Sequence, residues 1–159
     1  MRLTELLTTE RVAVRHNDGA RPIDKAGILT ILAQMLASGA RVDAKEVERV
    51  LSEREQLQST GIGEGVAIPH GALPQLDTQC AGLLVVPEGV DFAAIDGLKV
   101  NILFAVIGPK RATGEHLKTL ARVSRLLRNK TFRDRLVSAS DAKQAYDLIE
   151  AEEGERRGG

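Results

Sequence analysis

The stretch STGIGEGVAIPHG, residues 59–71, is the most informative part of this 159-residue chain. Glycine stands at positions 61, 63 and 65. Because glycine adopts backbone angles closed to other residues, tight turns or the close approach of another group are expected here. The run VAI at residues 66–68 predicts a short buried strand, which stops at Pro69 because proline cannot donate to a sheet ladder. His70 is therefore expected at a strand end, beside small residues and free backbone N–H groups, in a setting that suits contact with a phosphoryl group.

Helices and strands are predicted along the rest of the chain. Continuous apolar runs at residues 81–86 and 100–107 suit strands that are buried on both faces. Helices are expected near residues 24–38, 43–57, 113–128, 132–138 and 140–151, the longer ones from apolar periodicity. With no linker or internal repeat, this pattern predicts an α/β fold, a single three-layer domain spanning residues 1–151. Residues 152–159 are polar and glycine-ended, and are expected to form a disordered C-terminal tail.

Two helix starts carry recognisable signals. Asp43 and Glu46 match a capping box at the start of the helix over residues 43–57. Thr113 is the expected cap of the helix over residues 113–128. That helix is expected to turn one face inward, formed by Leu117, Leu120, Ala121, Ser124 and Leu127.

Composition restricts the class of protein. The 22 basic and 22 acidic residues cancel, so no overall field attracts nucleic acid or an anionic membrane. Aromatic residues make up 3% of the chain, which leaves little surface for stacking bases. The single cysteine, Cys80, fits a reducing cytoplasm and is expected in the core, and no apolar run is long enough for membrane insertion.

Three further segments join the glycine-rich stretch in one pattern. Arg54-Glu55 precedes the glycines, Phe92-Ala-Ala-Ile-Asp-Gly97 follows the next predicted strand, and His116-Leu-Lys-Thr-Leu120 opens the late helix. Together they resemble the signature of the mannitol/fructose-type enzyme IIA domains of the bacterial phosphoenolpyruvate-dependent phosphotransferase system. The likeness is greatest to the nitrogen-regulatory enzyme IIA branch. The resemblance implies the mannitol-type IIA fold, a mixed and mostly parallel central sheet with helices on both faces.

The resemblance assigns roles to three side chains. His70 is expected to be the phospho-acceptor, with one ring nitrogen free to attack and the other donating its proton to a fixed acceptor. His116 is expected beside it, stabilising the phosphoryl oxygens from the first turn of a helix. Arg54 is expected to grip the same oxygens with its guanidinium. Taken alone, each residue also has an ordinary interpretation: a histidine that ends a strand, a solvated histidine, or a helix-surface arginine.

The loop before His70 is a further candidate. Ser59 and Thr60 are expected to offer hydroxyls, and backbone N–H groups from Gly61 to Gly65, Gly63 included, to form an anion-binding concavity. The alternative is that these residues only make a turn. Asp96-Gly97 is expected to be a turn and His16 a surface residue, and the histidine spacing does not suggest zinc. The rim is expected to be apolar, with Gly61, Val66, Ile68 and Leu73 as candidate lining.

These expectations support three hypotheses about function. The first is a phosphohistidine relay that accepts its phosphoryl group from an HPr-like carrier and regulates nitrogen metabolism by binding a downstream target protein. The second is the IIA component of a fructose/mannitol-type uptake system, which passes the phosphoryl group to a IIB protein. The third is a binding module without chemistry. The first two need no metal, nucleotide or other cofactor, and all three are consistent with a cytoplasmic protein.

Overall fold

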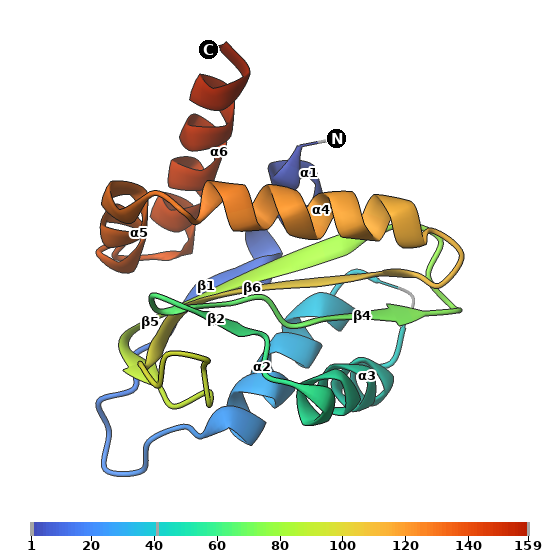
Figure 1. Cartoon of the computed structure of the whole chain (residues 1–159), viewed down its shortest axis with the longest axis horizontal. Coiled ribbons are helices and arrows are strands. Elements are labelled where there is room, and N and C mark those ends of the chain that lie inside the picture. Colours follow the sequence, from blue (N-terminus) through green and yellow to red (C-terminus); the bar gives the residue numbers. More distant parts are fainter. Residues whose placement is uncertain (1, 41, 159) are drawn as a thin grey trace.

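The computed structural model describes residues 2–40 and 42–158, which form three layers (Figure 1). One central sheet separates two apolar cores. The lower core in Figure 1 lies against α2 and α3, and the upper core lies against α1, α4, α5 and α6. The expected three-layer α/β architecture is confirmed.

The lower layer consists of α2 (Lys25–Ala37) and α3 (Ala44–Leu57). Asp24 caps α2 by accepting from the N–H of Gly27 at 2.8 Å, and Asp43 caps α3 by accepting from the N–H of Lys45 at 3.0 Å. Beyond the end of α2, Gly39 has a φ of +77°, the left-handed conformation that glycine adopts readily. Both caps define the residue at which each helix begins.

The sheet runs in the order β1-β5-β6-β3-β2, and β4 also pairs with β6. Its long central strands are β5 (Cys80–Val90) and β6 (Val100–Pro109), which pair antiparallel. β1 (Val12–Val14), β3 (Val66–Ala67) and β4 (His70–Leu73) pair parallel with them. β2 (Gly61–Gly63) pairs antiparallel with β3. Three of the five pairings are thus parallel, as expected for a mixed, mostly parallel sheet.

The strand that contains His70 was not expected. The prediction ended the chain's extended run at Pro69, but β4 begins at once with His70, in register with Val106 of β6. Proline is tolerated at position 69 because this residue joins the pairing with β6 through its carbonyl, which accepts from the N–H of Val106 at 2.9 Å. A Cβ on Gly71 would overlap Cγ1 of Val50 on α3, so glycine at this position lets β4 lie directly on that helix.

The upper layer consists of α1 (Leu3–Leu7), α4 (Thr113–Leu126), α5 (Lys130–Val137) and α6 (Ala142–Gly158). A short 3-10 turn, Thr9–Arg11, joins α1 to β1. α6 continues past Ala151 to Gly158, through residues expected to form a disordered tail. Glu153 is buried, and its carboxylate accepts from the N–H groups of Leu3 at 2.8 Å and Thr4 at 3.1 Å. Residues 152–158 are therefore helical instead of a disordered tail, because a polar side chain among them satisfies the free N–H groups of a helix that is far away in sequence.

Two expectations about α4 are wrong. Ala112 occupies the N-cap position without a side-chain hydrogen bond, and Thr113 is the first helical residue. The buried positions of α4 are Thr119, Val123 and Leu126 instead of the expected apolar face. Of that face only Leu127, the C-cap residue, is buried. Leu120, partly buried, packs against the upper core as expected. Leu120, Ala121 and Ser124 also line the pocket that contains His70, as described below, and Leu117 is exposed.

Candidate active site

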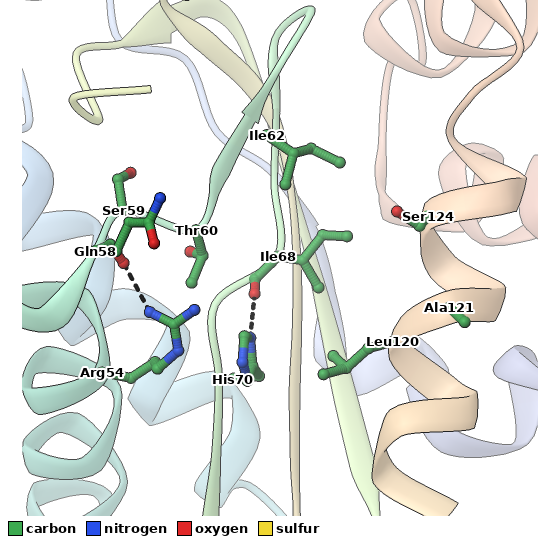
Figure 2. A pocket seen from close by; sticks show the side chains of 10 residues that line it. All are labelled: Arg54, Gln58, Ser59, Thr60, Ile62, Ile68, His70, Leu120, Ala121 and Ser124. Carbon is green, nitrogen blue, oxygen red and sulfur yellow. Dashed lines mark hydrogen bonds between the residues drawn. The ribbon is translucent and has the colours of Figure 1, made fainter. Parts of the chain in front are cut away.

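His70 is half-buried at the start of β4, on the edge of the sheet (Figure 2). Its Nδ1 lies 2.7 Å from the carbonyl oxygen of Ile68. A carbonyl can only accept, so Nδ1 carries the proton and donates it. The neutral ring then has its lone pair on Nε2, and the orientation of the ring is fixed by the backbone two residues earlier.

The environment of His70 favours the neutral imidazole. Burial lowers the pKa of His70 below its ordinary value, and the positive charge of Arg54 lowers this pKa further. The hydrogen bond to Ile68 acts in the opposite direction without cancelling the shift in pKa. At neutral pH the imidazole is thus mainly uncharged, with its lone pair at one defined atom.

His116 lies in the first turn of α4, with its ring centroid 5.7 Å from that of His70. Burial lowers its pKa, and the charge of His70 adds to the shift. The N–H of His116 donates to the carbonyl of Ala112 at 3.1 Å, so this backbone group is already used within the helix. The free N–H groups at the start of α4 therefore come before His116, and the imidazole itself is what His116 contributes to the site.

Arg54 reaches the site from the last turn of α3, on the opposite side of His70 from α4 (Figure 2). Its Nη1 donates to the carbonyl of Gln58 at 2.7 Å, one of the carbonyls left unpaired at the end of the helix. Arg54 and His70 line the same two pockets, of about 380 Å³ and about 620 Å³. The structure therefore brings together all three side chains that the sequence nominated.

A buried ion pair supports the loop behind Arg54. Glu55 is 8% exposed, and its carboxylate accepts from both the N–H and the hydroxyl of Thr60. Lys25 of α2 pairs with the same carboxylate at 2.9 Å and lies 4.6 Å from the ring centroid of Phe92. Lys25 could not be identified from the sequence, because the only signal for it would be its charge complementarity to Glu55, thirty residues later.

The glycine-rich stretch forms a hairpin and uses its polar groups internally. The hydroxyl of Ser59 donates to the carbonyl of Phe92 at 3.0 Å and accepts from the N–H of Gly61 at 3.1 Å. The N–H of Glu64 donates to Asp96 at 2.8 Å, in agreement with a turn at Asp96. Ser59 and Thr60 line the pocket, but both hydroxyls already have acceptors. Gly61 and Gly63 belong to β2, which shapes the hairpin instead of forming an open concavity.

An apolar rim surrounds His70, but its residues differ from those expected. Val66 and Leu73 are buried in the cores, and Ile68 is the one expected apolar side chain that lines the pocket. The exposed apolar residues Leu57 and Ile62 line the two pockets instead. Leu120, Ala121 and Ser124 line the α4 side (Figure 2), and Leu117, next to His116 on the same helix, is exposed. Three residues of the α4 face that was expected in the core, Leu120, Ala121 and Ser124, thus line this pocket.

Residues that could hold a metal gather elsewhere. Within residues 2–40 and 42–158 one such group exists, formed by His16, Asp18 and Glu88 on the surface. His16 and Glu88 form an ion pair at 2.8 Å, which raises the pKa of His16 and lowers that of Glu88. This pairing accounts for the cluster, and His16 is exposed as expected. Cys80 is buried as expected, and no helix in the described parts of the chain could cross a bilayer.

A known protein family matches most of the chain. The family described as "Phosphoenolpyruvate-dependent sugar phosphotransferase system, EIIA 2" matches residues 8–152. The chain belongs to this family. A nitrogen regulatory protein of Pseudomonas aeruginosa is 35% identical to this EIIA chain over 149 residues, covering 94% of the chain and 95% of the relative. A fructose-specific EIIABC component of Bacillus subtilis is 30% identical over 151 residues, covering 94% of the chain and 23% of that longer protein.

A solved structure agrees with the fold of this EIIA chain. Nitrogen regulatory protein IIA-Ntr from Neisseria meningitidis matches with a TM-score of 0.83 at 28% identity, covering 92% of this chain and 98% of that one. The expected family and fold are thereby confirmed. The chain is a phosphoryl relay protein of the phosphotransferase system, and its likeness to nitrogen regulatory proteins fits a regulatory role.

Proposed function

We propose that this EIIA chain accepts a phosphoryl group on Nε2 of His70 from a phosphohistidine carrier protein of the HPr type. The observation that carries the proposal is the 2.7 Å hydrogen bond from Nδ1 of His70 to the carbonyl of Ile68. This bond leaves Nε2 as the nitrogen with a lone pair, and the lowered pKa keeps that lone pair available at neutral pH.

Arg54 and His116 stabilise the transferred group from opposite sides. The guanidinium of Arg54 offers two N–H donors in a planar fork that matches a pair of phosphoryl oxygens. The imidazole of His116 lies 5.7 Å from that of His70, close enough for one phosphoryl group to lie between the two rings. Because charge spreads over the equatorial oxygens during transfer, donors on both sides lower the barrier. In this arrangement the reaction requires no metal or nucleotide.

The apolar rim supports a protein as the donor. Leu57 is 83% exposed and Leu117 is 60% exposed, on the two helices that flank His70. Apolar side chains at such positions would be covered by the carrier, which would also exclude water from the reacting phosphoryl group. A free small-molecule donor would leave this surface in solvent.

For the output, we favour regulation through protein binding. The nitrogen regulatory relatives are similar to this chain over almost their entire length. Transfer to a IIB protein is the second candidate, supported by the likeness to a fructose-specific EIIABC component. The two are separated by mixing the phosphorylated chain with IIB proteins of the same cell, because only the transport role predicts loss of its phosphoryl group to one of them.

The proposal is tested with purified chain, phosphoenolpyruvate, enzyme I and an HPr-like carrier. Intact-mass measurement should show one added phosphate on the wild-type chain, lost in acid and absent from His70→Ala. Absence of the added phosphate on a folded wild-type chain, with an active carrier, would favour a binding module. Normal labelling of His70→Ala would show that the acceptor is another residue.

A further inference from the structure

Two buried polar atoms lie unpaired next to the site. They are Nδ1 of His116 and Oε1 of Gln79, and neither has a hydrogen-bond partner within the described part of the chain. Native proteins rarely leave a buried polar side-chain atom without a partner, because its lost hydration is then not compensated. Each atom therefore needs an explanation, and His116 already has a place in the proposed reaction.

Gly108 shows that these two side chains share one space. Cys80 pairs with Ile107 in the antiparallel β5–β6 ladder, which places Gln79 beside Gly108. A Cβ on Gly108 would lie 3.1 Å from Cγ of Gln79 and 3.4 Å from Nδ1 of His116. Because Gly108 has no side chain, Gln79 and His116 both approach the same point above its Cα on the α4 face of the sheet.

We propose that Gln79 is the hydrogen-bond partner of His116, its amide oxygen accepting the proton of Nδ1. The donor and the acceptor are complementary and both buried. Cγ of Gln79 is held against Gly108, while the terminal torsion of a glutamine is broad and lets Oε1 turn toward the imidazole. Hydrogen bonds around a catalytic group are often long in the unliganded protein and tighten in the reacting complex.

This bond defines what His116 presents to the phosphoryl group, a role that rests on the function proposed above. With its proton held on Nδ1, the ring can take up a second proton at Nε2 beside the phosphoryl dianion, and Nε2–H then donates to a phosphoryl oxygen. A carbonyl acceptor suits both the neutral ring and the imidazolium, so the ring keeps its orientation if Nε2 takes up a proton beside a phosphoryl dianion. Gln79 is then a positioning residue, which acts through His116 and does not touch the phosphoryl group.

The first test is the tautomer of His116, read from the ¹⁵N shifts of its imidazole at about pH 8, where the ring is neutral. Wild type and Gln79→Glu, which keeps an acceptor oxygen, should show the Nδ1–H form. Gln79→Met has similar length and no acceptor, and should shift the ring toward the Nε2–H form. Gln75→Met makes the same change at an exposed position four residues earlier and should match wild type. An unchanged Nδ1–H form in Gln79→Met would overturn the proposal.

The second test is the rate of phosphoryl uptake from the carrier. Gln79→Met should lower it roughly tenfold, the effect of one lost hydrogen bond, and Gln79→Glu should recover most of the rate. Gly108→Ala places a methyl group against both Gln79 and His116 and should change both rate and tautomer with Gln79 intact. A shifted tautomer with an unchanged rate would show that Gln79 has no positioning role. If the wild type takes up no phosphate but its tautomer responds as stated, the proposed function fails and the Gln79 contact stands.

Discussion

At His70, one backbone hydrogen bond gives the two ring nitrogens different roles. Nδ1 donates to the carbonyl of Ile68, which leaves Nε2 as the only ring nitrogen with a free lone pair. Different roles for the two nitrogens could be predicted from the sequence, since a nucleophilic imidazole needs its proton held by a fixed acceptor. The sequence did not reveal the acceptor, because Ile68 contributes through its backbone and no side-chain pattern marks it.

The first prediction concerns the acidity of the histidines. Burial lowers the pKa of His70 and of His116, whereas the Glu88 contact raises the pKa of His16. An NMR titration should therefore show His70 and His116 titrating below about pH 6.5 and His16 above it. Phosphoryl uptake should stay constant as the pH falls to about 6.5 and decline only at lower pH. A pKa of His70 at or above its ordinary value would contradict the proposed neutral nucleophile.

The same shift affects stability with a defined sign. The folded pKa of His70 lies below its unfolded value, so the unfolded chain binds more protons as the pH falls below about 6.5. The contribution of His70 is therefore fully present above that pH and is lost toward the lower folded pKa. Urea denaturation as a function of pH should show a smaller acid-side loss of stability in His70→Gln than in the wild type.

A separate prediction concerns Arg54. Arg54→Lys keeps the charge but loses the planar fork, so the rate of phosphoryl uptake should fall by about tenfold or more with little change in the urea midpoint. Arg49→Lys is the matched control, because Arg49 lies on the same helix and pairs only with Glu46 and Glu53 among the described residues. Equal rates for the two variants would remove Arg54 from the proposed transfer site.

At the scale of elements, the turn from α3 into β2 depends on a buried carboxylate. Glu55 binds the backbone and hydroxyl of Thr60 and pairs with Lys25. Glu55→Ala should leave Lys25 and the N–H of Thr60 without a partner and lower the free energy of unfolding by about 3 kcal/mol. Urea denaturation measures this loss, and Glu53→Ala on the exposed face of α3 is the control. A loss no larger than that of the control would show that the network contributes no stability.

The apolar rim on α4 leads to a prediction at the same scale. Leu117→Asp should weaken carrier docking and lower kcat/KM for phosphoryl uptake roughly tenfold, while the urea midpoint stays near that of the wild type. Leu98→Asp is a matched control, since Leu98 is 59% exposed and Leu117 is 60% exposed. An equal effect of the two substitutions would indicate a general charge effect instead of docking at the rim.

Helix α4 also shows where sequence patterns stop being informative. Its existence and length were predictable from apolar spacing, but the buried face was not. Leu117 and Leu120 have the spacing of core residues, yet a surface that binds a protein partner uses the same residues at the same spacing. The burial of Thr119 and Val123 depends on the docking angle of the helix on β6, which local sequence does not encode.

At the scale of the whole molecule, the two ends of the chain are joined. The carboxylate of buried Glu153 on α6 binds the N–H groups of Leu3 and Thr4 on α1, and the hydroxyl of Tyr146 donates to the carbonyl of Thr4 at 3.2 Å. These contacts span more than 140 residues, which is why sequence analysis assigned Glu153 to a tail. The three layers could be predicted from the apolar patterns of single helices and strands. The contacts between α1 and α6 could not, because they form only when the whole chain has folded.

The contacts between α1 and α6 give the last prediction. Glu153→Ala should lower the free energy of unfolding by about 2 kcal/mol, because two buried N–H groups at the start of α1 lose a charged acceptor. Glu150→Ala, on the exposed side of the same helix, should not. The rate of phosphoryl uptake in native buffer should be unchanged in both variants, since α6 lines neither of the two pockets that contain His70. A free energy of unfolding of Glu153→Ala equal to that of the wild type would show that the contact between Glu153 and α1 does not stabilise the fold.

Transfer to Nε2 of His70 is tested most directly by locating the phosphoryl group on the phosphorylated chain. The phosphorylated chain, labelled with ¹⁵N in its histidines, would be examined by NMR for one-bond coupling between phosphorus and nitrogen. We expect coupling to Nε2 of His70, with Nδ1 still protonated and bound to Ile68. Coupling to Nδ1 of His70, or to either nitrogen of His116, would contradict it.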